Sequence, residues 1–437
     1  TGTDKCNAII NCHLATGKLG KVGAGPFSIT GQPNAMGGRE VGGLANMLAA
    51  HMDYTPDNIA TVSEFWNSTA VSQQVGLKAV DLFDAVADGQ IKVVWIIGTN
   101  PVVSMPNADR VKAALENCDT VIVSDCIAET DTTATANILL PATGWGEKSG
   151  TVTNSERRIS RQRSLLTAAG EAKHDWWILS QVGQAMGYGQ AFSYSSPRDI
   201  FVEHAALSGY ENSHEHKRLF NISALSHLSE PDYDQLQPIQ WPVTAAKPEG
   251  TPRLFSDGLF ATPSGKAQFI TSVSKLPKQQ LSADYPLALN TGRLRDQWHT
   301  MTRTGRASRL LDHTDQPFVG VHPATAAHYD LTDGDLAAVK TAHGTIEVVV
   351  QFDSNLKRDQ LFVPIHWNQQ FASNARVGTV IAPITDAVSG QPEFKFSAAA
   401  LCKISATGNA VLVSRNRLMC DSFSNWSVSP LDNNQGY

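Results

Sequence analysis

The residues best suited to bind an anion lie between Thr291 and Arg306. The fourteen residues from Arg293 to Arg306 hold four arginines, one histidine and three threonines. Guanidinium groups hold phosphate and carboxylate groups through paired hydrogen bonds. A basic patch that faces water is the alternative, but Trp298 and Met301 interleave with the charges and fit that alternative poorly. The pattern therefore predicts an anion-binding site in this run.

Two short polar turns are further candidates for ligand contacts. The sequence GTNP, which contains Asn100, follows one expected strand, and Ser124 and Asp125 end the next one. Ligands of open α/β sheets bind just beyond the carboxyl ends of the strands. Taken singly, these residues also fit a plain turn or a helix N-cap. Because both turns are expected at the same edge of a sheet, a ligand site is favoured.

The loop over residues 145–158 is a third candidate. It combines Lys148, Asn154, Arg157 and Arg158 with two glycines. Such a loop could clamp a phosphate group through its arginines. A solvated charged loop is the alternative interpretation, but Trp145 and the glycines favour a binding loop.

Alternating helices and apolar strands must position the first candidates. Strands apolar on both faces and separated by helices are typical of a parallel sheet covered on both sides. The sequence therefore predicts a doubly wound α/β domain. The expected strands are residues 92–98, 120–124 and 137–141, and the expected helices are residues 79–88, 107–116, 130–136 and 174–186.

The later part of the chain changes character. Strand-like segments at residues 286–290, 336–342, 345–352 and 361–365 are separated by turn signals, with a hairpin expected at His343 and Gly344. A mainly β, barrel-like domain is therefore predicted. The expected organisation is an α/β domain at 1–190, a connecting segment without clear periodicity at 191–283, the β barrel at 284–403 and an irregular tail at 404–437.

Composition excludes several classes of protein. The 437 residues carry a formal net charge of −6, which argues against a nucleic-acid-binding protein. No apolar run approaches the ~20 residues that a membrane helix needs. None of the six cysteines forms a C-x-x-C pair, so no closed zinc or iron–sulfur site is expected. Reduced thiols in a cytoplasmic protein are the favoured interpretation.

Five motifs in order resemble one known family. They are GPFSITGQPNAMGGREVGGLANMLAAH (residues 25–51), GTNP (98–101), VSDCIAETDTTATANILLPATGWGEKSGTVTNSERR (123–158), TGRLRDQWHTMTRTG (291–305) and SGQPEFK (389–395). The resemblance covers about residues 1–402. The chain is similar to the molybdenum oxidoreductases of the dimethyl-sulfoxide-reductase family, and within it to prokaryotic assimilatory nitrate reductases.

The resemblance implies the cofactor, molybdenum bis(molybdopterin guanine dinucleotide), and a barrel of the double-psi type. It also implies which residues contact the cofactor, but it assigns no metal ligand in this chain. The implied contacts of the α/β domain are Asn100, Ser124, Asp125, Lys148 and Asp175. The implied contacts of the barrel are Thr291, Gly292, Arg293, His299, Thr300, His366, Asn374 and Lys395.

Two geometric expectations follow from these contacts. The barrel should bring residues 291–300 close to Asn374 and Lys395, because one cofactor would bind them all. Asn100, Asp125 and Lys148 should converge on one edge of the α/β sheet, because they follow successive strand ends.

The resemblance also implies the activity, which is reduction of nitrate to nitrite in nitrate assimilation. Arg39 and Glu40 are weak candidates for residues near the substrate anion, and a buried structural ion pair is an equal or better interpretation of them. The implied electron donor is a ferredoxin, a flavodoxin or an NADH-dependent flavoprotein subunit. The alternatives are a formate dehydrogenase or a periplasmic nitrate reductase of the same family, and a fragment that binds the cofactor without turnover.

The family's cysteine motif for a [4Fe-4S] cluster and its molybdenum-ligating cysteine are not found in this sequence. Thr1 is therefore expected to lie inside a longer native protein that carries both. We predict that the chain alone binds part of the cofactor weakly and does not reduce nitrate, because a metal centre needs its protein ligand. Bound molybdenum and nitrite formation with a viologen donor test this, and stoichiometric molybdenum with steady nitrite production would contradict it.

Overall fold

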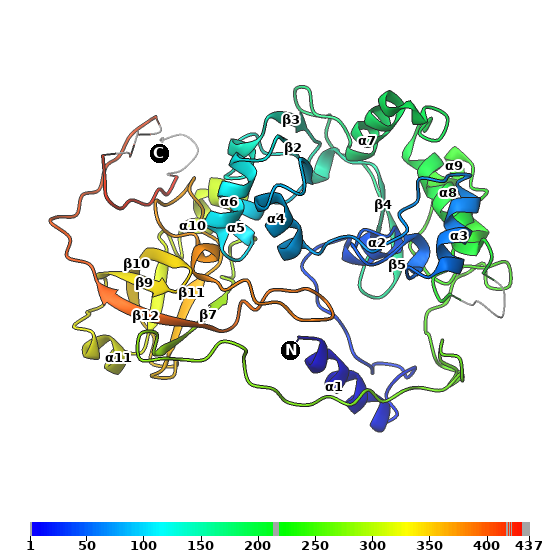
Figure 1. The fold of residues 1–437 in the computed structure, drawn as a ribbon. Coiled ribbons are helices and arrows are strands. Elements are labelled where there is room, and N and C mark those ends of the chain that lie inside the picture. Colours follow the sequence, from blue (N-terminus) through cyan, green and yellow to red (C-terminus); the bar gives the residue numbers. More distant parts are fainter. Residues whose placement is uncertain (1, 213–217, 417, 419, 421, 431–437) are drawn as a thin grey trace. The chain divides into compact units, whose positions relative to one another are not determined.

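The computed structural model describes residues 2–212, 218–416, 418, 420 and 422–430. The chain folds into two compact units, each built from segments that are distant in sequence (Figure 1). Unit 1 contains residues 79–141 and the chain from residue 275 onward, and unit 2 contains residues 2–78 and 142–274. The units thus alternate along the chain, and the sequence-derived boundaries at 190, 283 and 403 stay predictions.

Three parallel strands form the α/β part of unit 1, as the sequence predicted. Their order is β1-β2-β3, and Ile97 of β1 lies opposite Ser124 of β2. Asp125, the last residue of β2, lies opposite Pro141 of β3. The three strands are β1 (Val93–Ile97), β2 (Thr120–Asp125) and β3 (Ile138–Pro141).

Helices cover one face of this sheet. Val94 and Ile96 of β1 pack there with Val111 and Leu115 in one buried cluster. On the opposite face of the edge strand β1, Val93 and Ile97 are 59% and 40% exposed. The helices of this part are α4 (Ala79–Ala87), α5 (Pro101–Ser104) and α6 (Ala108–Glu116).

The predicted helix over residues 130–136 is wrong, because only a single 3₁₀ turn, η2 (Thr133–Thr135), forms there. The backbone N–H of Thr130 donates to the Thr133 hydroxyl at 2.7 Å, and the N–H of Thr133 donates to the Thr130 hydroxyl at 3.0 Å. Threonine side chains compete in this way with helical backbone hydrogen bonds.

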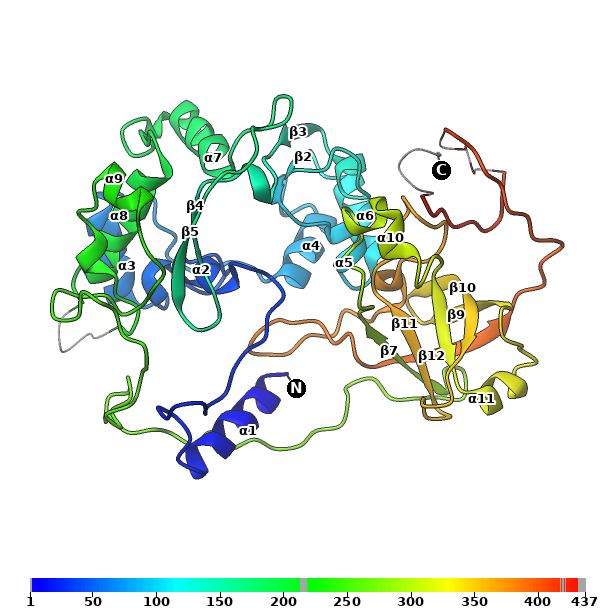
Figure 2. The same cartoon turned by 180° about the vertical axis from the view of Figure 1, so that it is seen from behind.

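A closed six-stranded barrel forms the rest of unit 1, which confirms the predicted β domain (Figure 2). The strand order is β10-β8-β11-β7-β12-β9, with parallel pairs β10–β8 and β11–β7. β9 and β10 form the hairpin expected at His343 and Gly344. The strands are β7 (Leu287–Gly292), β8 (Phe318–Val321), β9 (Leu336–Thr341), β10 (Gly344–Phe352), β11 (Gln360–Pro364) and β12 (Ser397–Lys403).

The barrel interior is a packed apolar core. Leu289, Val339 and Leu361 are completely buried, and Ile346 and Leu401 are almost so. Burial of side chains of this size stabilises the fold by about 1.5–3 kcal/mol each. Short helical segments join the strands: η6 (Thr304–Arg306), α10 (Ser308–Leu311), α11 (Pro323–His328) and η7 (Val377–Val380).

Residues 376–381 connect the barrel to the α/β part of unit 1. The buried Arg376 guanidinium forms an ion pair with Asp109 of α6. The backbone N–H of Asn107 donates to the carbonyl of Ile381 at 3.0 Å. These contacts hold the two parts of unit 1 together although almost 270 residues separate Arg376 from Asp109 along the chain.

Unit 2 contains an antiparallel sheet, ordered β4-β5-β6, and a helical core. The buried cluster includes Met52, Val62, Phe220 and Tyr233. The sheet strands are β4 (Gly150–Thr153), β5 (Arg158–Gln162) and β6 (Ile239–Gln240). The helical segments are α1 (Gly2–Ala15), α2 (Ala35–Glu40), η1 (Ala49–His51), α3 (Pro56–Phe65), η3 (Trp145–Glu147), α7 (Asp175–Gly183), η4 (Gln184–Tyr188), α8 (Pro197–Gly209), η5 (Ser223–Leu225) and α9 (Glu230–Asp234).

The 13-residue helix α8 lies in the segment that the sequence analysis left without periodicity. Its start carries a recognisable signal, because Ser196 and Asp199 form a capping box with Pro197 at the first helical position. The expected helix at residues 174–186 is α7, which continues into the single π-type turn η4.

The described part of the tail returns to the barrel. The N–H of Ser373 donates to the carbonyl of Trp426 at 3.0 Å, and the N–H of Val428 donates to the carbonyl of Phe371 at 2.8 Å. Among the helices of the described residues, none has the length and apolar character needed to span a membrane.

We predict that Gly378→Ala destabilises unit 1. A Cβ atom at this position would collide with the carbonyl oxygens of Met105 and Val103. Overpacking of this kind costs about 1–3 kcal/mol. Urea unfolding followed by far-UV circular dichroism should show a lower midpoint. Gly408→Ala is the matched control, because a Cβ atom there meets nothing within 4 Å. Equal midpoints for the two variants would contradict the close packing between barrel and α/β part.

Candidate functional site

The end of strand β7 and the segment before β12 meet at Thr291, as predicted. The Thr291 hydroxyl donates to the carbonyl of Phe394 at 2.7 Å, and the Lys395 ammonium donates to the carbonyl of Thr291. Thr291 is 1% exposed, so its side chain belongs to the framework of the site. Lys395 is thereby held at the strand end that carries Gly292 and Arg293.

Buried His366 fixes the loop that follows β7. Its Nε2 accepts from the N–H of Leu294 at 2.8 Å, so its Nδ1 carries the proton and donates to the carbonyl of His299 at 2.7 Å. Burial lowers the pKa of this imidazole, the hydrogen bond to the His299 carbonyl partly offsets that effect, and the charge of Arg293 lowers the pKa further. His366 is therefore neutral and acts as a brace between both ends of the 294–299 loop.

Several cationic groups face one another at this strand end. Burial and the charge of Arg293 lower the pKa of Lys395. Burial, Arg293 and Arg303 together lower the pKa of His299. The charge of Glu393 partly offsets the effect on Lys395. Arg293 and Lys395 are exposed, so a ligand can reach both side chains. A partly desolvated cluster of this kind is suited to bind phosphate oxygens.

Asn100 connects this cluster to the α/β sheet within unit 1. The Asn100 side-chain amide donates to the Thr300 hydroxyl at 3.2 Å, and its carbonyl oxygen accepts from the Thr132 hydroxyl at 2.6 Å. Asn100 is 6% exposed. The GTNP turn thus lies against the barrel loop, which brings two of the sequence-predicted regions together.

Asp125 lies at the same sheet edge and has no cationic partner in direct contact among the described residues. One of its carboxylate oxygens accepts from the N–H of Ile127 at 2.9 Å. Burial raises the pKa of this carboxyl, and its hydrogen bonds and the charge of Arg303 partly offset that effect. Directly beyond Asp125 is a cavity of about 290 Å³, lined by Cys126, Ile127, Ala128, Glu129 and Arg306.

Ser124 has a structural role in the sheet. Its hydroxyl accepts from Trp95 Nε1 at 2.9 Å, its carbonyl accepts from the N–H of Gly98 at 2.9 Å, and it is 1% exposed.

Arg303 and the cavity residue Arg306 lie in the run of residues 291–306 but were not predicted individually as site residues. By contrast, Arg295 is 72% exposed and is paired with Asp296.

Among the described residues, Asn374 forms no hydrogen bond with Thr291 or Lys395. Its side-chain amide donates to a carboxylate oxygen of Glu347 at 3.4 Å, and its backbone carbonyl accepts from the backbone N–H of Glu347 at 2.9 Å. Its assignment to the cofactor stays a prediction.

Lys148 and Asp175 belong to unit 2, where they form an ion pair with each other. Both side chains are about one-third exposed. Asn100 and Asp125 belong to unit 1, so the convergence of Lys148 with them stays a prediction.

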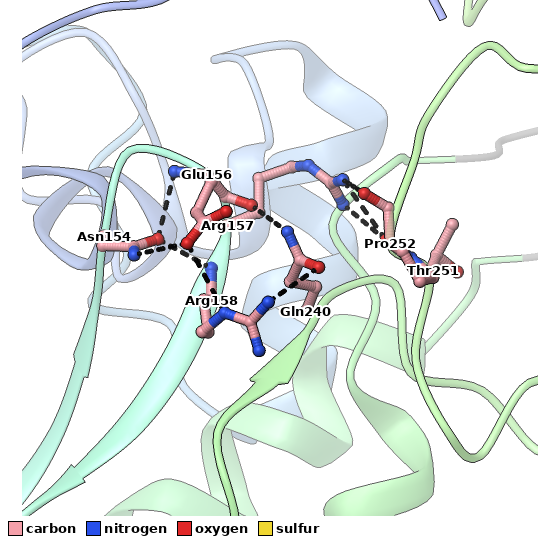
Figure 3. A network of polar contacts seen from close by, with 7 residues as sticks. All are labelled: Asn154, Glu156, Arg157, Arg158, Gln240, Thr251 and Pro252. Carbon is pink, nitrogen blue, oxygen red and sulfur yellow. Dashed lines mark hydrogen bonds and ion pairs between the residues drawn. The ribbon is translucent and has the colours of Figure 1, made fainter. Parts of the chain in front are cut away.

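The 145–158 loop does not offer its arginines for a phosphate clamp, which corrects the third candidate. Arg157 donates to the carbonyl of Trp241. It also donates to the carbonyls of Thr251 and Pro252 (Figure 3). Figure 3 also shows Arg158 turned toward the side chain of Gln240, to which it donates at 3.3 Å. These bonds fasten the β4–β5 turn to the segment that follows β6.

Arg39 and Glu40 do not form the ion pair that was one interpretation of the sequence. Glu40 is 4% exposed and accepts hydrogen bonds from Thr153 and Trp241, whereas Arg39 is exposed. Among the described residues no cluster of three or more histidine, cysteine or acidic side chains is arranged to hold a metal ion.

Comparisons with known sequences identify two matching families. The molybdopterin oxidoreductase family matches residues 1–185, and the molydopterin dinucleotide binding domain matches residues 287–398. The second match includes Thr291, Arg293, His366 and Lys395.

Similar proteins include oxidoreductases with different substrates in their names. The chain is 48% identical to a nitrate reductase of Klebsiella oxytoca over 98% of this chain and 48% of that protein. It is 32% identical to the assimilatory nitrate reductase catalytic subunit of Bacillus subtilis, over 92% of this chain and 55% of that protein. It is 30% identical to the alpha subunit of a formate dehydrogenase of Methanococcus maripaludis, over 92% and 56% of the two chains.

A solved structure confirms the fold. Acetylene hydratase from Pelobacter acetylenicus aligns with a TM-score of 0.57 over 76% of this chain and 47% of that one, at 19% sequence identity. The chain spans about half the length of the curated relatives it matches. Its two matched domains, its closed barrel and these relatives together show that the chain belongs to the molybdopterin oxidoreductases.

Proposed function

We propose that this chain is part of an enzyme that reduces nitrate to nitrite, in which it holds a guanine dinucleotide arm of the molybdenum cofactor. The observation that carries the proposal is the cationic cluster around Arg293 and Lys395 at the end of β7. The similarity to nitrate reductases of Klebsiella oxytoca and Bacillus subtilis supports the choice of substrate.

The described residues fit such a cofactor. Arg293, His299 and Lys395 present donors to a diphosphate group, whose negative charge the Arg293 and Lys395 side chains would attract. Asp125 offers carboxylate oxygens that can accept from ribose hydroxyls or from a purine edge. Arg303 lies close enough to influence Asp125 and His299 alike, so it can bridge the two regions.

When bound, the molybdenum cofactor would supply the two-electron chemistry of nitrate reduction. This chain's own residues bind and orient the dinucleotide arm. Asn100 holds the barrel loop against the sheet edge. His366 fixes the conformation of that loop through its hydrogen bonds with Leu294 and His299. Arg39, exposed at the end of α2, is the proposed contact for the nitrate anion, because a guanidinium group attracts and orients it.

The finer features belong to the same proposal. We infer a cytoplasmic, assimilatory enzyme that receives electrons from a ferredoxin, a flavodoxin or an NADH-dependent flavoprotein subunit. A periplasmic nitrate reductase and a formate dehydrogenase are the alternatives, and the formate dehydrogenase relative of Methanococcus maripaludis favours the second of these. In the full-length protein, nitrite formation with reduced viologen supports the proposal, whereas formate-dependent reduction of oxidised viologen without nitrate reduction would overturn it.

We predict that Lys395→Gln weakens cofactor binding. The variant loses one charge-assisted contact to a phosphate, worth about 1.5–3 kcal/mol, so affinity should fall by roughly tenfold or more. The chain is produced in a host that makes the cofactor, and guanine nucleotide released by acid is quantified per chain. Arg309→Gln is the control, because Arg309 is exposed and lies outside the cluster. Equal nucleotide content in both variants and the parent would contradict the role of Lys395.

A further inference from the structure

The Glu40 carboxyl group lies in the core of unit 2. Trp241 Nε1 donates to its Oε1 at 2.6 Å, and the Thr153 hydroxyl lies 2.8 Å from its Oε2. Trp241 follows strand β6 and Thr153 ends strand β4. One carboxyl group therefore ties the last residue of the six-residue helix α2 to two other segments of the fold.

The beginning of α2 depends on the same strand end. The N–H of Thr153 donates at 2.8 Å to the side-chain oxygen of Asn34, which precedes the first residue of α2. Both ends of the helix are thus fastened to Thr153, one through its backbone and one through its hydroxyl. Because Arg39 is the neighbour of Glu40, these contacts also fix the backbone from which the exposed Arg39 side chain extends.

Glu40 has no cationic partner in hydrogen-bond contact among the described residues. Burial raises the pKa of its carboxyl to about 7, and the hydrogen bonds from Thr153 and Trp241 limit that rise. Burial without a counter-charge disfavours the charged form of a carboxyl, so the group takes up a proton at a higher pH than it would in water.

The position of the proton follows from the donors. An indole N–H can only donate, so Oε1 must remain an acceptor in both states of Glu40. A hydroxyl group can donate or accept, so the added proton lies on Oε2 and is donated to the Thr153 oxygen. Ionisation therefore requires the Thr153 hydroxyl to turn from acceptor to donor while the Trp241 contact stays in place.

Other ionisable groups surround this contact. The His51 ring of η1 meets the Trp241 ring edge-on at 5.7 Å, and burial and Arg39 lower the pKa of His51. The Arg157 guanidinium lies over the Trp241 ring at 5.2 Å. His204 of α8 stacks on Phe220 at 5.2 Å, and burial lowers its pKa to about 4, with a further contribution from His51. At neutral pH both histidines are uncharged, which leaves Glu40 as the group that changes its charge.

We propose that Glu40 is a proton-binding positioning residue, which through Thr153 and Trp241 sets the orientation of α2 and of the adjacent Arg39. An effect of Glu40 protonation on nitrate binding rests on the proposed function, in which Arg39 contacts the substrate anion. The protonation of Glu40 and its coupling to Trp241 concern unit 2 alone and can be tested without the cofactor.

The test follows the indole ¹H–¹⁵N signals of the full chain as the pH rises from 5 to 9. The chain has nine tryptophans, and the signal of Trp241 is assigned as the one that Trp241→Phe removes. We expect this signal to move between two limits with a midpoint near pH 7, because its acceptor gains a negative charge as Glu40 ionises.

Three variants separate Glu40 from its neighbours. Glu40→Gln keeps an acceptor for Trp241 and a donor for Thr153, so it mimics the protonated state and should abolish the movement. Thr153→Val removes the donor to ionised Glu40 and should raise the midpoint by about one pH unit, whereas Thr153→Ser should restore it. His51→Gln should leave the midpoint near pH 7.

Stability gives an independent measure of the same raised pKa. A folded-state pKa raised to about 7 from an ordinary value of 4.5 means that the stabilising effect of Glu40 is complete below about pH 4.5 and is lost as the pH rises through 7. The urea midpoint of Glu40→Gln should therefore rise relative to the parent between pH 4.5 and 7 and stay level above.

A Trp241 signal that does not move, or that moves identically in Glu40→Gln, would overturn the proposal. A signal that moves as expected in a full-length protein that does not reduce nitrate would contradict the proposed function alone. Movement lost in His51→Gln but kept in Glu40→Gln would assign the titration to His51 and likewise overturn the proposal.

Discussion

The side chain of Asn100 makes the contact on which the candidate site depends. Its amide bonds the barrel loop at Thr300, and its oxygen accepts from Thr132 behind the sheet edge. An asparagine can serve both neighbours because it carries a donor and an acceptor on one planar group. Asp125 at the sheet edge and Arg293 on the barrel loop thereby belong to one framework, although they are far apart in sequence. Asn100 itself is 6% exposed, so its main contribution is to hold the two surfaces together.

The surrounding framework holds the cationic cluster at the end of β7 in place. His366 stays neutral and holds the loop by its two ring nitrogens. The Thr291 carbonyl accepts from Lys395, which fixes the ammonium group beside Arg293. The ion pair between Arg376 and Asp109 secures the barrel against α6. The site therefore has the preorganised donors that a diphosphate requires, and this supports its assignment to the dinucleotide.

The sequence predicted the three strands of the α/β part and four of the six barrel strands, because their apolar runs and turn signals are local. It did not predict β8 and β12. The proximity of Lys395 and Thr291, more than 100 residues apart, was expected only from the family resemblance, which implies that one cofactor contacts both. Side-chain competition was harder to predict. The Thr130 and Thr133 hydroxyls replaced helical bonds with their own. Arg157 donates hydrogen bonds to three backbone carbonyls instead of facing a ligand. Glu40 accepts a hydrogen bond from Trp241, which lies about 200 residues away in the sequence. Such choices depend on which distant carbonyl or donor the fold brings near, and local spacing carries no information about that. The start of α8 was not predicted, although its capping box of Ser196 and Asp199 is a local sequence signal.

The central claim is that the dinucleotide diphosphate binds at the end of β7. The most direct measurement is an experimental structure of the cofactor-loaded full-length protein. The account predicts diphosphate oxygens within about 3 Å of the Arg293 guanidinium and the Lys395 ammonium, with Asp125 facing the nucleoside. A diphosphate held instead by Arg157 and Arg158 of the β4–β5 turn, with the β7 end empty, would contradict it.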